Sequence, residues 1–214
     1  MLNATQLFEQ RLTTPERHLF SCLSTPAEIQ AFLDEITYSR EDRNRSPLNV
    51  LRDRQAHCLD GAVFAAAALR RLGYPPVIVD MLPEPGLDDD HVLAIYEQNG
   101  GLGALAKSNF TGLRSREPVY RSLRELVMSY FEDYFNVDGV KTLRGYTVPL
   151  NLETCDHQGW MWSEAPLNEL ERRLPRLRHF PLLNAAMVAN LRALDPRSYQ
   201  AGLLGARMGE LFAP

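Results

Sequence analysis

The chain has 214 residues, of which 45% are hydrophobic and 23% charged, and its formal net charge is -4 at pH 7. This balance excludes a general affinity for nucleic acid or anionic membranes, and the length allows one substantial core. The first residues lack a basic segment followed by an apolar stretch, and no run approaches the roughly 20 apolar residues of a membrane span. We therefore expect a single cytoplasmic domain that acts on a small molecule or a protein.

The three cysteines, Cys22, Cys58 and Cys155, are odd in number and lack the spacing of a metal knuckle. This pattern favours free thiols in a reducing compartment over a disulfide framework. Cys22 lies in an apolar stretch, so we expect it to be buried.

The N-terminal part predicts short helices at about 14–23 and 26–37, because each begins with a threonine followed by a proline. Residues 39–46 read as a polar connector. A serine and a proline then predict a third short helix, from 46 to 51.

The strongest helical signal begins at Cys58, runs through an alanine-rich segment and stops at Gly73. The N-terminus of a helix favours a thiolate, which lowers the pKa of a cysteine and makes it nucleophilic. Cys58 is therefore a candidate nucleophile whose own backbone N–H would stabilise an oxyanion. The alternative is a buried structural thiol beside Ala62 and Ala65.

The segments after this helix predict an α+β fold. A β-branched run at 76–82 predicts a strand buried on both faces, and a strand at 91–96 predicts a hairpin with one at 102–108. Further along we expect a turn-rich segment at 111–120, helices at 121–131, 165–175 and 182–193, and a strand at 145–150.

A thiol nucleophile needs a base, and His91 is placed for this role at the start of a strand that follows a loop. His57 precedes Cys58 directly, so the two side chains should point in different directions. His18 and His179 have no evident partners and are expected to be structural.

The segments Gln55–Ala66 and 72–77 resemble the nucleophile helix of the transglutaminase-like superfamily, and residues 90–96 resemble its histidine strand. The resemblance covers about residues 47–109. It implies a papain-like core, with a nucleophile helix packed on an antiparallel sheet, and acyl transfer at amide or peptide carbonyls through an acyl-enzyme. The outcome would be hydrolysis, deamidation or transfer to an amine. A peptide, a protein or a small amide would be the substrate, and no cofactor or metal is implied.

Around that core, at 47–150, we expect a helical N-terminal part at 1–46 and a helical C-terminal extension at 151–214. The sequence does not predict the oligomeric state.

The third member of such a triad is usually an aspartate on the strand after the histidine, and that strand has no acid here. A two-residue hairpin turn would place Ser108 opposite His91, and a three-residue loop would place Asn109 there. We favour Asn109, whose amide oxygen can accept the imidazole N–H, with Ser108 in reserve. Gln55 is a possible second oxyanion donor, or a solvated loop residue. The missing acid keeps open an alternative function, a catalytically degenerate binding or scaffold protein.

Three other features have weaker functional interpretations. The run Asp88-Asp89-Asp90 is expected to be a solvated acidic loop, which could select a basic or amine-bearing substrate, with a metal-dependent hydrolase as the alternative. The corner from Cys155 to His157 lacks a second ligand pair nearby, so we discount a metal there. Three arginines could bind a carboxylate or phosphate or form surface salt bridges (Arg114, Arg116 and Arg121), and two tryptophans are expected to anchor the core (Trp160 and Trp162).

Overall fold

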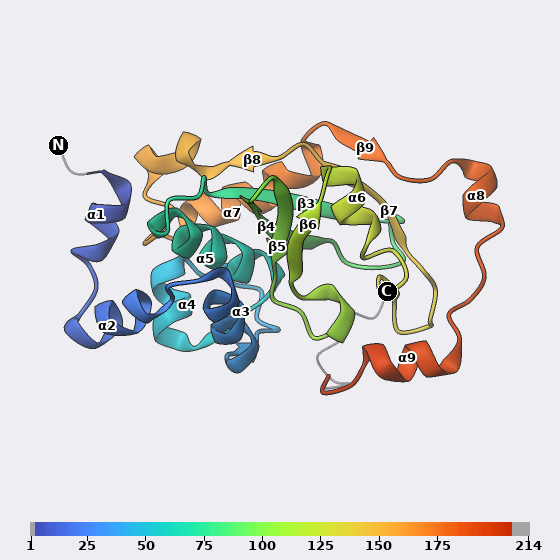
Figure 1. Cartoon of the computed structure of the whole chain (residues 1–214), viewed down its shortest axis with the longest axis horizontal. Coiled ribbons are helices and arrows are strands. Elements are labelled where there is room, and N and C mark those ends of the chain that lie inside the picture. Colours follow the sequence, from blue (N-terminus) through green and yellow to red (C-terminus); the bar gives the residue numbers. More distant parts are fainter. Residues whose placement is uncertain (1–2, 207–214) are drawn as a thin grey trace.

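The computed structural model of the chain describes residues 3–206. Its main sheet has the strand order β6-β5-β4-β3-β7-β9, with β8 paired to β3, and helices pack against it (Figure 1). The strands of this sheet are β3 (Val77–Pro83), β4 (His91–Gln98), β5 (Gly101–Leu105), β6 (Arg116–Tyr120), β7 (Leu143–Thr147), β8 (Leu150–Asn151) and β9 (His179–Pro181). All of the strand pairings in this sheet are antiparallel among the described residues, so the expected α+β class is confirmed.

The N-terminal helices are α1 (Ala4–Glu9), α2 (Thr14–Cys22), α3 (Pro26–Glu35) and α4 (Pro47–Asp53). The last three confirm the expected elements, and each has proline in its first turn after a capping threonine or serine. Helix α1 was not expected. A two-stranded parallel sheet, β1 (Thr37–Tyr38) with β2 (Gln55–Ala56), joins this part to the central helix.

Helix α5 (Cys58–Arg71) is the expected central helix, and it packs against β3 and β4 on one side and against α3 and α4 on another. Every residue from its start through Leu69 is buried. Gly61 allows α5 to approach the segment after β5 closely, because a Cβ at this position would lie 2.3 Å from the Cβ of Lys107. The first turn of α5 is thus held directly against the chain that follows β5.

The β4–β5 hairpin closes with a two-residue turn, in which Asn99 and Gly100 both have positive φ angles of 53° and 79°. Gln98 pairs with Gly101 and Ala94 with Leu105. The three-residue loop favoured from the sequence is therefore wrong. Strand β5 also ends at Leu105, because the Gln30 side chain bonds both the N–H and the carbonyl of Ala106 in place of a neighbouring strand.

The C-terminal half contains α6 (Leu123–Met128), α7 (Ala165–Arg173), α8 (Ala185–Ala189) and α9 (Pro196–Gly202), and short 3-10 helices at Thr111–Leu113, Leu152–Gln158 and Leu174–Arg176. Helix α8 covers only five residues of the helix expected at 182–193. Strand β6 lies in the segment expected to be turn-rich.

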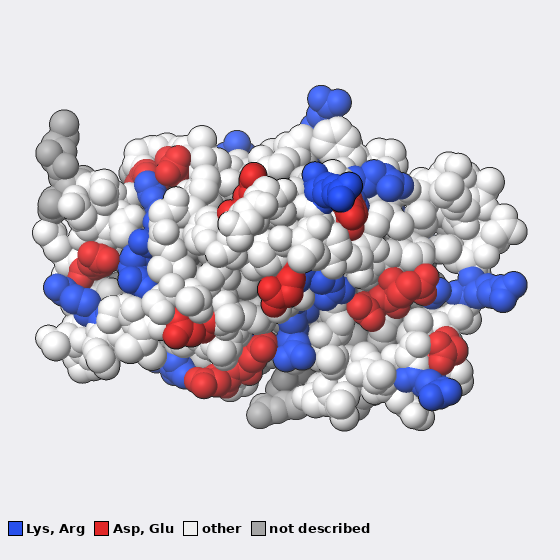
Figure 2. All heavy atoms as spheres, in the orientation of Figure 1, with Lys and Arg blue, Asp and Glu red and all other residues white. Residues whose placement is uncertain are grey.

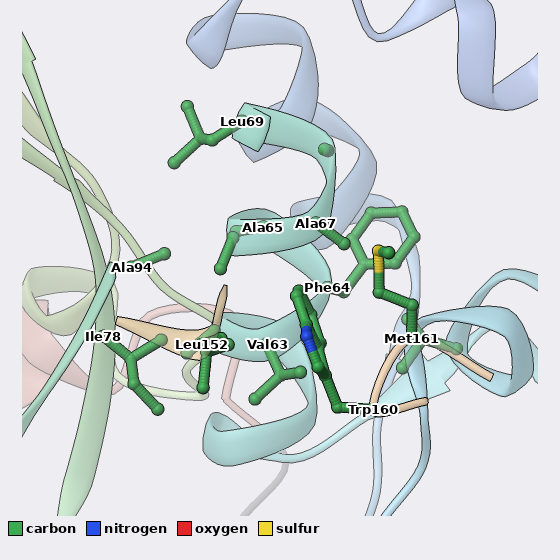
Figure 3. Close-up of a cluster of buried hydrophobic side chains, with 14 of the residues drawn as sticks. Val63, Phe64, Ala65, Ala67, Leu69, Ile78, Ala94, Leu152, Trp160 and Met161 are labelled. Atoms are coloured by element: carbon green, nitrogen blue, oxygen red, sulfur yellow. The ribbon is translucent and has the colours of Figure 1, made fainter. Parts of the chain in front are cut away.

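The two faces of the sheet bury two separate hydrophobic clusters. One joins α5 and the N-terminal helices to Ile78, Val92 and Ala94, and it includes the fully buried Trp160 (Figure 3). The other joins Val79, Leu93 and Ile95 to α6. Trp160 confirms the expected core anchor, whereas Trp162 is only partly buried and packs under Arg11.

The surface carries interspersed charges of both signs over the face shown in Figure 2. Cys22 is exposed on α2, so its expected burial is wrong; of the residues of that helix only Phe20 is buried. The Cys22 Sγ lies 3.9 Å from Nε2 of His18, which gives that histidine a neighbour. Among the described residues, no helix is long and apolar enough to cross a bilayer.

Candidate functional site

Cys58 is the first residue of α5 and lines a pocket of about 500 Å³. Its side chain is nearly enclosed, with 8% of the residue exposed. The thiol donates a weak hydrogen bond to the backbone carbonyl of Asp90, with the sulfur 3.8 Å from the oxygen. Since a carbonyl can only accept, this contact requires the protonated thiol.

The pKa of Cys58 is raised well above its ordinary value, first by burial and then by Asp90 and Asp89. The backbone N–H of Val92 acts in the opposite direction. A helix N-terminus contributes about 0.3–1 kcal/mol at an exposed position, whereas taking a charge out of water costs several kcal/mol. Burial therefore outweighs the helix end, and the expected lowering of the thiol pKa is not found.

His91 begins β4, but its side chain lies on the face of the sheet opposite α5. It pairs with Met81, which belongs to the α6-side cluster together with Leu93. The ring Nε2 lies 2.8 Å from the carbonyl oxygen of Leu113, so Nε2–H is the donor. Burial lowers the pKa of His91 to about 4, which keeps the ring neutral at physiological pH.

The structure therefore does not bring Cys58 and His91 together. The reason is the alternation of side chains along β4, where residues of even number face α5 and those of odd number face α6. Val92 and Ala94 belong to the cluster around α5, and Asp90 lines the Cys58 pocket. The residue beside the thiol is thus an aspartate, one position before the histidine.

The other expected partners of the site are also dispersed. Ser108 and Asn109 line a smaller cavity with His91, but the hydrogen bond of the His91 ring goes to Leu113. The two-residue turn favours Ser108 over Asn109 in register, although β5 ends before either residue. Gln55 lies in β2 and is not among the residues that line the Cys58 pocket.

Asp80 is a buried acid that the sequence analysis did not single out. It pairs with Val92 and so lies on the α5 face, close to Asp90. Its side chain is fully enclosed, and its carboxyl forms a hydrogen bond with the Asp90 carboxyl when one of the two is protonated. Its position in the apolar run 77–82 was the available signal, because a lone acid inside a buried strand needs a partner.

Asp80 and Asp90 titrate together. Burial, followed by the nearby Asp90, raises the pKa of Asp80 to about 9. Burial, followed by Asp89, raises the pKa of Asp90 to about 6. At neutral pH the pair therefore shares one proton and carries one negative charge.

Residues 39–44, which belong to the polar connector expected at 39–46, form a wall of the Cys58 pocket. They are held by Arg45, a fully buried side chain that donates to Ser39, Glu41 and Asp53. A buried arginine with several acceptors fixes the loop in one conformation. Arg45 is thus a positioning residue for the pocket.

His57 also lines the pocket, and its ring lies beside the buried Asp60. The Nε2 of His57 lies 3.3 Å from Oδ1 of Asp60, which also accepts the Arg45 backbone N–H at 2.6 Å. Burial and the Arg45 charge lower the pKa of His57 to about 4, and burial raises the pKa of Asp60 to about 7. The imidazole is therefore neutral at neutral pH, and its contact with Asp60 is not an ion pair.

The weaker expectations have clear structural outcomes. Arg114 and Arg116 form salt bridges with Asp34 and Asp133, each at 3.2 Å. In the corner near Cys155, Asp156 binds Arg70 in a bidentate pair. Within residues 3–206, no group of three or more His, Cys, Asp or Glu side chains is arranged to hold a metal ion.

No protein-family model and no curated protein sequence matches the chain. Among solved structures, EGTA-treated LapG of Legionella pneumophila covers 83% of this chain and 99% of its own, with 13% identity and a TM-score of 0.41. A second LapG structure from Legionella pneumophila covers 50% of this chain and 74% of its own, with 15% identity and a TM-score of 0.36. Similarity at this level carries no argument about family or activity.

Proposed function

We propose that the chain acts by binding a ligand in the Cys58 pocket, as a protein with a cysteine-enzyme-like arrangement of helix and sheet but without a working thiol nucleophile. One observation carries the proposal: the thiol donates to the Asp90 carbonyl and faces carboxyl groups, while the imidazole is on the other face of the sheet. An uncharged thiol among carboxylates is a poor nucleophile, because a second negative charge there is unfavourable.

The pocket supports a binding role by its size and lining. Its volume of about 500 Å³ lies within the range of roughly 300–1,000 Å³ for small-molecule sites. Its walls come from the loop at 39–44, the start of α5, the start of β4 and α7. Arg45 fixes the loop at 39–44 in one conformation.

A transglutaminase-like cysteine enzyme is the second candidate. It is favoured by Cys58, which is the first residue of a long helix and lines the pocket. His91 would be its base, with Asn109 or Ser108 orienting the ring and Gln55 as a second oxyanion donor. This mechanism requires the first residue of β4 to turn its side chain to the α5 face.

The two candidates differ in the fate of an acylating probe. Purified protein is incubated with a glutamine-containing peptide plus hydroxylamine, and separately with a chloroacetamidine electrophile, followed by peptide mapping. The binding proposal expects no hydroxamate and no preferential labelling of Cys58 over the exposed Cys22. Turnover that is lost in Cys58→Ser would overturn the proposal and support the enzyme.

A further inference from the structure

The segment from the last turn of α7 to β9 carries positive charge that the described residues do not neutralise. Four exposed arginines lie there within seven residues: Arg172, Arg173, Arg176 and Arg178. Arg172 forms a salt bridge with Glu169 at 2.9 Å. Within the part of the chain that the structure describes, the other three arginines have no salt bridge. Because the whole chain has a net charge of -4, this unpaired positive charge is a local property of the surface.

Strand β9 ends the main sheet beside these arginines, and it pairs with β7 alone among the described strands. The Arg178 carbonyl and the Leu182 N–H both form backbone hydrogen bonds with the β7 segment. Successive residues of an antiparallel strand alternate in the direction of these groups, so His179 directs its N–H and C=O away from β7. Pro181 lacks an N–H, so this edge suits a short extended segment rather than a long added strand.

Two guanidinium groups are held in place on the α6 side of this edge. The Arg178 guanidinium lies over the Phe180 ring, 5.1 Å from its centroid, and Phe180 packs against the α6-side cluster. Arg124 of α6 donates through Nη2 to the Leu182 carbonyl at 3.3 Å. A guanidinium stacked on a ring keeps its N–H groups available for carboxylates. Figure 2 shows basic side chains gathered over α6 and beside β9, near the upper edge of the view.

We propose that this basic edge, formed by β9 with Arg124, Arg173, Arg176 and Arg178, binds a short, extended acidic segment of a partner protein. Carboxylates of the segment pair with the arginines, and its backbone pairs with the N–H and C=O of His179. A peptide fits better than a nucleic acid or a lipid surface, because only a peptide adds its backbone to a strand edge. None of these arginines lines the Cys58 pocket, so the inference is independent of the binding function proposed above.

The test is fluorescence anisotropy of the full chain with a labelled octaglutamate peptide, with octaglutamine and octalysine peptides as controls. We expect octaglutamate to bind with a Kd of about 100 µM or below at low salt, and the two controls not to bind. Binding should weaken about tenfold when the salt concentration is raised from about 20 mM to about 200 mM, because exposed ion pairs are screened.

Two sets of variants separate the arginines from the backbone edge. Replacing two arginines together, Arg176→Gln with Arg178→Gln, should weaken binding by about fivefold, as for loss of two exposed ion pairs. Arg192→Gln removes an exposed arginine outside this edge and should leave the affinity unchanged. His179→Pro removes the N–H that faces away from β7 and should weaken binding by about fivefold, whereas His179→Ala should not.

The outcomes that would overturn the proposal are distinct. They are absence of octaglutamate binding, equal binding of octaglutamine, and full affinity in the folded double-arginine variant. Equally tight binding of a decathymidylate oligonucleotide or of phosphatidylserine vesicles would also overturn it, because the backbone edge would then contribute nothing. If His179→Pro does not fold, the double-arginine variant and the two control peptides still decide the question.

Discussion

The two faces of the β3–β4 pair carry different chemical groups near the start of β4: a thiol and carboxyls on one face, and an imidazole on the other. On the α5 face, the Cys58 thiol donates to the Asp90 carbonyl, and the buried Asp80 carboxyl lies close to that of Asp90. On the α6 face, His91 is enclosed and its ring donates to the Leu113 carbonyl. The thiol of α5 and the imidazole of β4 thus lie on opposite faces of the same strand start. Whether the two can act as a pair depends on the face of the strand that the histidine side chain occupies.

The buried titratable groups on the two faces also change the free energy of unfolding in opposite directions as pH rises. A buried acid with a raised pKa binds more protons folded than unfolded, so its contribution makes stability fall as pH rises from about 4 to about 9. A buried histidine with a lowered pKa binds fewer protons folded than unfolded, so its contribution makes stability rise from about pH 4 to about pH 6.5.

The largest loss of stability is expected where α5 contacts the segment after β5, at Gly61 and Lys107. Gly61→Ala places a methyl group 2.3 Å from the Lys107 Cβ, an atom fixed to the backbone. We expect a loss of roughly 2–3 kcal/mol in the free energy of unfolding, because overpacking outweighs the gain of about 1 kcal/mol in helix propensity. Chemical denaturation measures it. A variant as stable as the parent would mean that α5 and the segment after β5 are not in contact.

Asp80→Asn removes the buried carboxyl while keeping its shape. At about pH 8 we expect the variant to be more stable than the parent by about 2 kcal/mol, since the parent must keep a proton or bury a second charge. The difference should shrink towards pH 4, where the unfolded chain also becomes protonated at this position. Denaturation midpoints across this range test the sign, and a difference that grows towards low pH would contradict the account.

On the other face, His91→Leu leaves the Leu113 carbonyl without its donor. We expect a loss of about 1 kcal/mol at neutral pH, the worth of one buried hydrogen bond less the gain from an apolar side chain. The loss should diminish as pH falls from about 6.5 towards about 4, because only the parent loses stability by keeping its histidine neutral. His91→Gln, which retains a donor, is the matched control.

The sequence predicted the elements well where local signals were strong. The prolines that open α2, α3 and α4 and the alanine run of α5 agree with the structure because capping and helix propensity are local effects. Strand β6 was missed because it carries charges and Pro118, and an edge strand tolerates both.

The site was harder to predict for a physical reason. Residues 91–96 are buried on both faces, so the run has no alternation of polar and apolar residues to show which side His91 occupies. The register of the β4–β5 hairpin was also ambiguous in the sequence. Because Gly100 and Gly101 are adjacent, a two-residue turn and a three-residue loop were both possible. Burial of the first turn of α5 also depends on distant contacts, such as Lys107 against Gly61, that no local pattern reveals.

The most direct test of the separation of the two faces is the pH profile of Cys58 alkylation by iodoacetamide, followed by peptide mapping with the exposed Cys22 as an internal reference. We predict that Cys58 reacts more slowly than Cys22 at every pH up to about 9 and that His91→Gln leaves its profile unchanged. Rapid reaction of Cys58 near pH 6, lost in His91→Gln, would contradict the account and make the imidazole the partner of the thiol.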